Sequence, residues 1–393
     1  MEGYDVYQDI SERTEGCIYI GVVGPVRTGK STFIKRFMDL LVLPNMDNEF
    51  KRERTRDELP QSANGKTIMT TEPKFVPNEP IELTLRENAK FKVRLVDCVG
   101  YLVEGAMGHL EDNSPRMVNT PWFEDRIPFE EAAEIGTRKV IADHSTIGLV
   151  VTTDGSITDL PRRSYIEAEE RVIKELKELE KPFIVALNSA RPKAQETIEL
   201  REALETKYNT PVMIIDALKM EMDDLEGILG KILFEFPAKE INFHIPRWMD
   251  TLELDHWLKQ GIVDSIRMNL SEVNRIRDID DAIRKFDGAE NLQAVEISDM
   301  RLGEGVVNIT ISLEDGLFYR VLGEVSGYSL EGDYQLVALV KELAQSKREY
   351  DKVKSALGDV KEFGYGMVAP SVEEIKLEEP VIVKQGSKFG VRL

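Results

Sequence analysis

Residues 24–31 have the types and the spacing that phosphate binding requires. They read Gly-Pro-Val-Arg-Thr-Gly-Lys-Ser, which matches the phosphate-loop pattern G-x-x-x-x-G-K-[ST]. The glycines let backbone N–H groups turn inward around the α- and β-phosphates, and the N-terminus of a following helix adds a favourable dipole. Lys30 is placed to reach the β- and γ-oxygens, and the hydroxyl of Ser31 to hold Mg²⁺. The motif therefore predicts binding of a nucleoside triphosphate with Mg²⁺, and we expect hydrolysis.

The nucleotide contacts predicted from this loop and from the start of the next helix are Gly24, Arg27, Thr28, Gly29, Lys30, Ser31 and Thr32. A chance turn before an amphipathic helix is the alternative interpretation. The strand-like segment before the loop and the helix-like segment after it favour the phosphate loop, because the motif needs that context.

A carboxylate that follows another apolar run is the second candidate. Asp97 begins the sequence Asp-Cys-Val-Gly at residues 97–100, a D-x-x-G arrangement. A carboxylate at the C-terminal end of a parallel strand faces the same crevice as the phosphate loop, where it can bind Mg²⁺ through water. The amide of Gly100 is placed to contact the γ-phosphate and report its loss. We predict Asp97 as a catalytic and metal-site residue and Gly100 as a nucleotide contact.

The segment between these motifs has the position of a first switch loop in GTPase-like proteins. Residues 65–73 read Gly-Lys-Thr-Ile-Met-Thr-Thr-Glu-Pro. A threonine in such a loop can ligate Mg²⁺ and sense the γ-phosphate. We predict Thr70 and Thr71 as catalytic residues, with Thr70 also a metal ligand. The alternative is a threonine pair that simply enters a strand.

The loop expected to contact the base departs from the guanine-binding pattern. GTPases of this order have N-K-x-D there, whose aspartate accepts two hydrogen bonds from guanine, whereas residues 188–191 read Asn-Ser-Ala-Arg. An arginine cannot accept those bonds, and leaving guanine donors unpaired in a buried site costs about 1–3 kcal/mol. We expect guanine selectivity to be lost, with Asn188 still a nucleotide contact. Residues 216–218, Asp-Ala-Leu, resemble the last base-loop motif, so the pocket itself should persist.

Arg27 occupies a loop position where some GTPase relatives place an asparagine that binds a catalytic K⁺. Its guanidinium would supply that positive charge in cis, as an arginine finger does. A surface arginine or an ordinary phosphate contact is the alternative. The four histidines are scattered without ligand spacing, which argues against a zinc site.

Alternating strand-like and helix-like segments position these residues over the first ~240 residues. The alternation predicts an α/β fold with a mostly parallel sheet, and the order of the motifs above predicts a P-loop NTPase domain of the GTPase-like (TRAFAC-type) class. Buried parallel strands are predicted at 18–23, 93–96, 147–151, 183–187 and 212–215. Helices are expected at 31–41 and, as an amphipathic crossover, at 164–180.

The pattern of apolar residues changes between Pro237 and Pro246, and the new pattern predicts a smaller α+β domain. Apolar residues at every third or fourth position predict one long amphipathic helix over 262–286 and a second over 334–357. Alternation at 307–313 predicts a strand with one buried face. We therefore predict an ATPase domain at 1–240 and a middle domain, without a chemical motif, at 241–393. The chain stops in a strand-like pattern, so we expect a further C-terminal region to be missing from it.

Composition limits the classes of function. Hydrophobic residues at 42% and charged residues at 31% suit a soluble globular protein, and there is neither a membrane-spanning run nor a leader, so we expect a cytosolic protein. A net charge of −20 argues against a nucleic-acid partner. Cys17 and Cys98 lie in or beside apolar runs and are expected to be buried free thiols.

Taken together, these residues resemble the stage IV sporulation protein A family, ATPases that build the basement layer of the spore coat in endospore-forming bacteria. The likeness covers residues 1–393 and is most specific at 22–33, 57–62, 65–76, 94–101, 119–122 and 131–140. Family members descend from a GTPase-like ancestor yet use ATP, in agreement with the departure at the base loop. The resemblance implies Lys30 as the nucleotide-binding lysine and Asp97 as the Mg²⁺-site carboxylate. Thr70 and Thr71 carry over as the hydrolysis-sensing threonines.

The resemblance also implies ATP-driven self-assembly into a static polymer in the mother-cell cytoplasm, at the outer surface of the forespore. Its implied partners are copies of the same chain, a small amphipathic membrane peptide that recruits it, and other spore coat proteins. Family members extend beyond residue 393, and that region is tied to localisation and assembly. The alternative function is a regulatory GTPase-like switch that changes partners without polymerising. A binding module without chemistry is disfavoured, because Lys30, Ser31 and Asp97 are all present.

Overall fold

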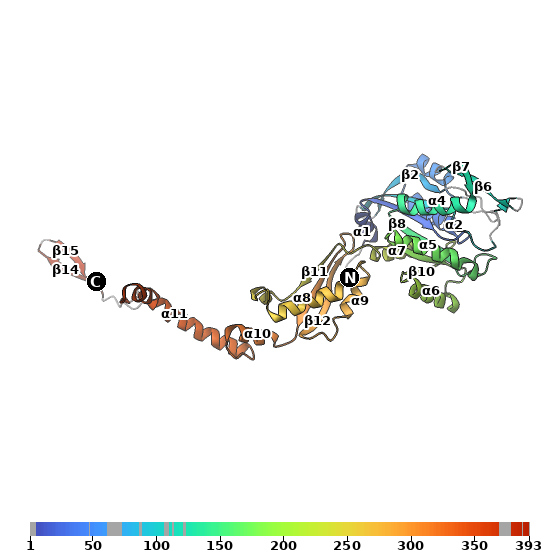
Figure 1. Cartoon of the computed structure of the whole chain (residues 1–393). Helices are drawn as coiled ribbons and strands as arrows, with labels where there is room; N and C mark the ends of the chain where they lie inside the picture. The colour runs from blue at the N-terminus through green and yellow to red at the C-terminus, as the bar shows by residue number, and fades with distance from the viewer. Residues whose placement is uncertain are drawn as a thin grey trace. The chain divides into compact units, whose positions relative to one another are not determined.

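Five apolar strands form the body of a six-stranded sheet in the computed structural model, in the order β10-β9-β8-β1-β3-β2 (Figure 1). They are β1 (Cys17–Val23), β3 (Ala89–Asp97), β8 (Ile147–Thr153), β9 (Phe183–Asn188) and β10 (Val212–Ile215). All five run parallel, so the predicted parallel sheet is confirmed. The strand β2 (Lys74–Leu85), which the sequence did not suggest, pairs antiparallel with β3 at the edge.

The structure describes residues 5–46, 48–60, 73–85, 89–105, 110–111, 114–120, 123–368, 379–386 and 388–392. Within these residues the chain also forms one helix and four short strands between strands of the large sheet. They are α3 (Glu49–Asp57), β4 (Leu110–Glu111), β5 (Ser114–Pro115), β6 (Met117–Thr120) and β7 (Phe123–Pro128). The short strands pair antiparallel as β4 with β5 and β6 with β7.

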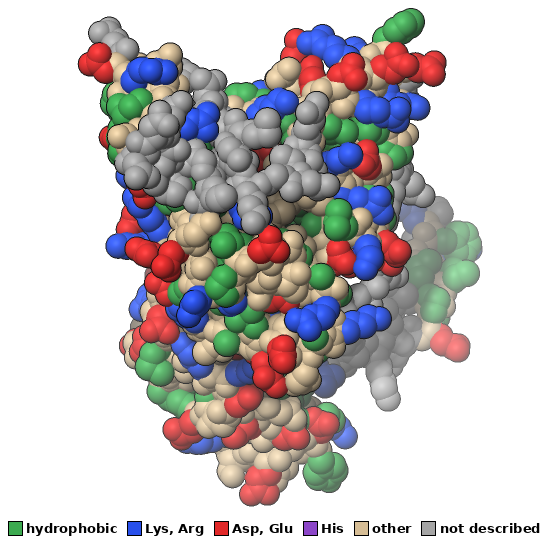
Figure 2. Space-filling view, turned by 90° about the vertical axis from the view of Figure 1, so that its right-hand side faces the viewer, with side chains coloured by type: hydrophobic (Ala, Val, Ile, Leu, Met, Phe, Trp, Pro, Cys, Tyr) green, Lys and Arg blue, Asp and Glu red, His purple; other side chains and the backbone are tan. Residues whose placement is uncertain are grey.

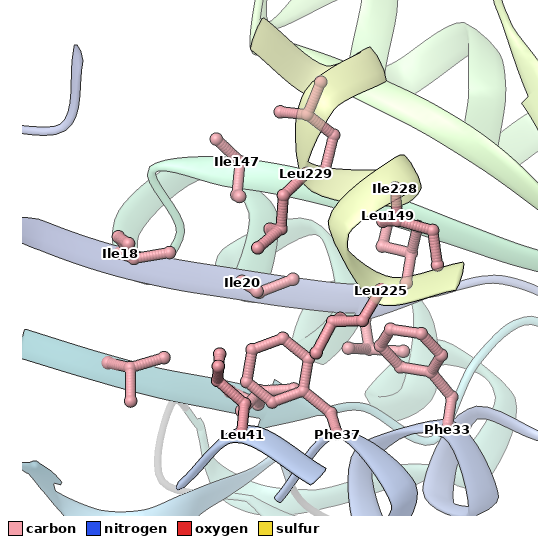
Figure 3. Close-up of a cluster of buried hydrophobic side chains, with 14 of the residues drawn as sticks. Ile18, Ile20, Phe33, Phe37, Leu41, Ile147, Leu149, Leu225, Ile228 and Leu229 are labelled. Carbon is pink, nitrogen blue, oxygen red and sulfur yellow. The ribbon is translucent and has the colours of Figure 1, made fainter. Parts of the chain in front are cut away.

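Helices cover both faces of the large sheet, which explains why its strands are apolar on both sides. One layer is α1 (Val6–Arg13), α2 (Lys30–Phe37) and α7 (Met222–Phe234). The other is α4 (Phe129–His144), α5 (Ile166–Glu178) and α6 (Gln195–Tyr208). In the first layer, Phe37 of α2 and Leu225 of α7 lie beside Ile20 of β1 (Figure 3). The α2 helix continues through a π turn at Met38–Val42 and a 3₁₀ turn at Leu43–Asn45.

A second, smaller sheet has the order β11-β13-β12. Its strands are β11 (Glu240–His244), β13 (Val306–Leu313) and β12 (Leu292–Arg301). Along β13, Val307, Ile309 and Ile311 are buried while Thr310 is exposed, which confirms the predicted half-buried strand. Val307 and Ile309 pack against Ile279 of the neighbouring helix α9 (Asp278–Arg284).

The single long helix predicted over 262–286 is wrong. The chain forms α8 (Trp257–Leu270), then leaves the helical path for residues 271–277, then forms α9. The Ile276 N–H donates to the carbonyl of Phe236 at 3.1 Å, and Ala238 N–H donates to Asn274 O at 3.2 Å. These long-range backbone hydrogen bonds replace the helical ones. The periodicity of apolar residues in the sequence does not reveal the resulting break in the helix.

Two arginines in that interruption share one buried carboxylate. Arg275 Nη1 lies 2.5 Å from Glu235 Oε2, and Arg277 Nε lies 3.0 Å from Glu235 Oε1. The Glu235 side chain is fully buried, and each arginine side chain is 22% exposed. Burial raises the pKa of Glu235, and the two arginine charges oppose that shift. The cluster therefore fixes the end of α7 to the interruption between α8 and α9.

The chain divides into two compact units, residues 1–312 and 313–393. The second contains α10 (Leu317–Ser326), α11 (Asp333–Phe363) and an antiparallel pair, β14 (Val381–Gln385) with β15 (Lys388–Arg392). The helix predicted over 334–357 is thus present and longer. Its apolar stripe is not buried as in an ordinary amphipathic helix, since Leu343 is 46% exposed and Tyr350 49%.

Both cysteines are free thiols, but they differ in burial. Cys98 is buried as expected, whereas Cys17 at the start of β1 is only partly buried, so that expectation is corrected. In the part of the chain that the structure describes, no helix is long and apolar enough to span a bilayer. On the face shown in Figure 2, acidic side chains in red and basic side chains in blue are intermingled, so the net charge of −20 is not gathered there into one acidic patch.

Glu235→Gln is expected to lower the free energy of unfolding of the first unit by about 3–5 kcal/mol, because both arginines lose their compensating charge. Urea unfolding followed by tryptophan fluorescence measures the change. Glu178→Gln is the matched control, since Glu178 and Lys174 form an exposed pair 4.0 Å apart. That substitution should change stability by less than about 1 kcal/mol. Equal effects of the two substitutions would contradict a structural role for the Glu235 cluster.

Candidate nucleotide-binding site

The loop between β1 and α2 follows a path that its two motif glycines permit. Gly24 has φ 137° and Gly29 φ 94°, both in the region that side chains rarely adopt. A Cβ on Gly24 would lie within 3.0 Å of the Val151 carbonyl of β8, and one on Gly29 equally close to the Asn188 side-chain amide. The loop therefore lies tightly against the carboxyl ends of β8 and β9.

Lys30 is folded over the loop that precedes it. Its Nζ donates to the carbonyls of Gly24 at 3.2 Å and Pro25 at 2.7 Å. The residue is 5% exposed, and burial lowers the pKa of Lys30, while nearby Asp97 acts in the opposite direction. Thr28 Oγ1 also donates to Pro25 O at 3.0 Å. A positive charge is thus held at the centre of the loop, where polyphosphate oxygens would lie in such a fold.

Asp97 ends β3 beside the first turn of α2. Ser31 Oγ donates to Asp97 Oδ2 at 2.7 Å. The other oxygen, Oδ1, is buried and has no hydrogen-bond partner among the described residues. Burial raises the pKa of Asp97, opposed by the Ser31 hydrogen bond and by the Lys30 charge. A serine hydroxyl next to an unpaired carboxylate oxygen is a hard-oxygen donor set, so these residues fit Mg²⁺.

Gly100 lies directly against the phosphate loop. It has φ 87°, and a Cβ there would lie within 3.0 Å of both the Gly24 carbonyl and Lys30 Nζ. The next residue is also tied to the loop, because Val26 N–H donates to Tyr101 O at 2.9 Å. The structure therefore brings the D-x-x-G segment and the phosphate loop together at one edge of the sheet.

Tyr101 was not identified from the sequence. Its hydroxyl donates to Glu175 of α5, and the Arg171 guanidinium lies 5.1 Å from its ring centre. Burial raises the pKa of Tyr101, and the Glu175 carboxylate adds to the shift. In this conformation the side chain points to α5 rather than to the phosphate loop. Its position next to Gly100 was the only signal in the sequence.

Asn188 links the phosphate loop to the predicted base loops. Its Nδ2 donates to Thr28 O at 3.0 Å, and its Oδ1 accepts from Ala217 N at 3.0 Å. The residue is 4% exposed. Arg191, which replaces the guanine-binding aspartate, is exposed. Asp216 Oδ1 accepts from Leu218 N at 3.1 Å, so the last base loop is closed by its own side chain.

A second carboxylate at this edge, Asp154, was also missed. It follows β8 directly and accepts from Ser156 N at 2.9 Å, Ser189 Oγ at 2.6 Å and Thr197 Oγ1 at 3.1 Å. Burial raises the pKa of Asp154, but these hydrogen bonds outweigh it, so the pKa is lowered. The network holds the loop at 188–191. The sequence could have identified Asp154, because it follows a predicted buried strand just as Asp97 does.

Four predicted site residues remain, two in or next to the phosphate loop and two outside the described residues. Arg27 is half-buried with φ 63°, a left-handed conformation that is uncommon for a side chain of this size, and its charge acts on Tyr165. Thr32 is partly buried in the first turn of α2. Thr70 and Thr71 lie outside the described residues, so their roles stay predictions.

Comparison with known proteins identifies the family of the chain. Residues 1–237 match the family described as "Stage IV sporulation protein A, ATPase domain", and residues 238–393 match "Stage IV sporulation protein A, middle domain". The chain belongs to the stage IV sporulation protein A family. Its N-terminal part is that family's ATPase domain, so this family member binds ATP and is an ATPase. The α/β fold expected from the sequence is confirmed.

Two relatives illustrate the similarity. The chain is 54% identical over 389 residues to stage IV sporulation protein A of Clostridioides difficile (strain 630), covering 99% of this chain and 79% of that one. It is 50% identical over 393 residues to stage IV sporulation protein A of Bacillus subtilis (strain 168), covering 100% and 80%. Among solved structures, a crystal structure of an SsGBP variant aligns with TM-score 0.31 and 18% identity over 57% of this chain and 56% of that one, which is too distant to inform function.

Gly100→Ala is expected to lower ATP turnover by at least about a hundredfold, because the added methyl displaces Lys30 or the Gly24 carbonyl from the site. Steady-state phosphate release measures it. Gly16→Ala is the matched control: Gly16 has φ 75°, yet a Cβ there meets nothing within 4 Å. Both variants carry the left-handed backbone penalty of about 1–2 kcal/mol, so equal turnover in the two would show that strain, and not contact with the loop, matters.

Proposed function

We propose that this chain hydrolyses ATP with Mg²⁺ and couples hydrolysis to its self-assembly into the basement layer of the bacterial spore coat. The observation that carries the proposal is the contact between Ser31 and Asp97, beside the buried Lys30, at the carboxyl edge of the sheet. A cation, a hydroxyl and a carboxylate with one unpaired oxygen converge there. This is the donor set that phosphoryl transfer needs.

Each residue of the edge has a distinct part in the proposal. Lys30 binds the β- and γ-oxygens, and the Gly100 amide donates to the γ-phosphate. Ser31, Asp97 and Thr70 would hold Mg²⁺, which when bound neutralises charge that develops on the phosphates. Arg27 supplies further positive charge from the same loop.

The base loops support a preference for ATP over GTP. Guanine recognition needs a carboxylate where the exposed Arg191 lies. Ser189 cannot substitute, because its hydroxyl already donates to Asp154 and accepts from Arg191 N at 2.9 Å. A guanine would leave its donors unpaired in this pocket, whereas an adenine lacks those donors.

The cellular part of the proposal rests on relatives that are named for stage IV of sporulation. We propose that the chain acts in the mother-cell cytoplasm at the forespore surface. There a small amphipathic peptide would recruit it, and other coat proteins would bind it. We also propose that the ATPase domain spans 1–240 and the middle domain 241–393.

ATP is expected to give a kcat/KM at least about tenfold above that of GTP, because losing the guanine contacts removes roughly 1.4 kcal/mol or more. Phosphate release with each nucleotide measures it. A kcat/KM for GTP that exceeds that for ATP would refute the assignment of the base loop.

Sedimentation of the full-length protein, including the region beyond residue 393, with ATP, with GTP and without nucleotide tests the proposed assembly. We expect pelleting with ATP and turnover of ATP, both abolished by Lys30→Ala. Turnover without pelleting would favour the regulatory switch, and binding without turnover would favour a module without chemistry.

The double variant Thr70→Ala/Thr71→Ala is expected to keep ATP affinity within about tenfold, because the phosphate loop makes most of the contacts. Turnover should fall much further, since a switch hydroxyl helps to hold the loop in its catalytic arrangement. Limited proteolysis should show a chain held in its pre-hydrolysis shape. A variant with normal turnover, or one that no longer binds ATP, would mean that the wrong loop has been assigned.

A further inference from the structure

The long helix α11 carries an apolar seam with a seven-residue repeat. Its a and d positions are Leu336, Leu339, Leu343, Ser346, Tyr350, Val353, Leu357 and Val360. A repeat of 3.5 residues per turn, kept over several heptads, is the pattern of a coiled coil rather than of a helix lying on a globular core. The single polar member, Ser346, disfavours shifted registers in which it would face a larger apolar neighbour.

Five of the eight seam residues are exposed in the structure, and Leu336, Leu339 and Val353 are partly buried. Of the 31 residues of α11, all of them described, Ala356 is the buried one. Leu343, Leu357 and Val360 are 46%, 46% and 45% exposed. A contiguous apolar strip of this kind marks an interaction surface, because burying it in a partner removes it from water.

The charges beside the seam indicate which partner fits. Position g holds Glu342 and Glu349, and position e holds Lys347 and Lys354. In a parallel pair, position g of one helix faces position e of the next heptad of the other. Glu342 would then face the partner's Lys347, and Glu349 the partner's Lys354.

An antiparallel pair would bring like positions together. Glutamate would face glutamate and lysine would face lysine, which is repulsive. A lipid surface fits less well, because membrane-surface helices carry mainly basic residues beside the apolar face, whereas here both signs flank it. The charges at positions e and g therefore favour a second copy of the same helix in the parallel orientation.

We propose that α11 pairs with α11 of a second copy of this chain as a parallel, in-register coiled coil over residues 336–360. The pairing gives the proposed self-assembly one defined contact but requires no nucleotide. It is therefore tested in the absence of nucleotide and Mg²⁺, so that its failure leaves the proposed ATP hydrolysis untouched.

Sedimentation equilibrium of the whole 393-residue chain in EDTA measures self-association. Leu343→Asp places a charge at an a position and should raise the dissociation constant by at least about a hundredfold. Val337→Asp is the matched control, because Val337 is 67% exposed on the same helix but lies at position b. It should leave the dissociation constant unchanged.

A wild-type chain that stays monomeric at high micromolar concentration would overturn the proposal. So would association that both aspartate variants weaken equally, since the seam would then not be the contact. ATP turnover of Leu343→Asp should equal wild type, because Leu343 lies outside the proposed nucleotide site. Association of the wild-type chain in EDTA without any ATP turnover would count against the proposed function, not against the pairing.

Disulfide trapping tests the orientation. In a Cys17→Ser background, Leu343→Cys should crosslink to itself under mild oxidation, because equivalent a positions meet in a parallel pair. Arg348→Cys, at the outer position f, should not. Association that persists without a Leu343→Cys crosslink would overturn the parallel arrangement.

The charge pairs are tested by reversal and rescue. Lys354→Glu should weaken association about tenfold by facing the partner's Glu349, and adding Glu349→Lys in the same chain should restore it. Failure of the second substitution to restore association would overturn the assigned register.

Discussion

The hydrogen bond between Ser31 and Asp97 depends on a single strand register, which brings the phosphate loop and the D-x-x-G segment to one edge of the sheet. The two residues are 66 positions apart in the chain. They meet because β1 and β3 run parallel with Val22 opposite Asp97, so that both strands end at the same edge. A slip of one residue would turn Asp97 to the opposite face of the sheet. Helices on both faces hold the register by burying every strand between them.

The same edge concentrates polar groups that are costly to bury. Lys30, Asp97 and Asn188 are each 5% exposed or less. Lys30 and Asn188 use their hydrogen-bonding groups on main-chain atoms, which keeps the loops in place before any ligand arrives. Asp97 differs, because one of its oxygens stays without a partner among the described residues. Electrostatic preorganisation of this kind spares a catalyst from reorganising during the reaction.

The sequence predicted those elements and site residues that depend only on residues adjacent in the chain. Apolar runs identified the five parallel strands, and the motif at 24–31 identified the loop, because each depends on adjacent residues. Asp97 was found from its place after a strand. The roles of these residues, and those of Thr70 and Thr71, stay predictions.

Long-range partners explain what the sequence did not reveal. The break between α8 and α9 makes backbone bonds to Phe236 and Ala238, and its Arg275 contacts Glu235, 40 positions earlier in the chain. The Asp154 network joins the end of β8 to Ser189 and Thr197, which lie 35 and 43 positions further along the chain. The exposed stripe of α11 follows the same periodicity as a buried one, so periodicity alone could not distinguish them.

Asn188 has a consequence for how such an enzyme can diversify. Its amide joins the loops through main-chain groups of Thr28 and Ala217, so the joint is indifferent to the side chains around it. Arg191, three residues on, is exposed and takes no part in that joint through its side chain. Under the proposed function, residue 191 could therefore be exchanged without disturbing the joint that Asn188 makes with the phosphate loop. In that case, the choice of base and the chemistry at the phosphates would be separately evolvable traits.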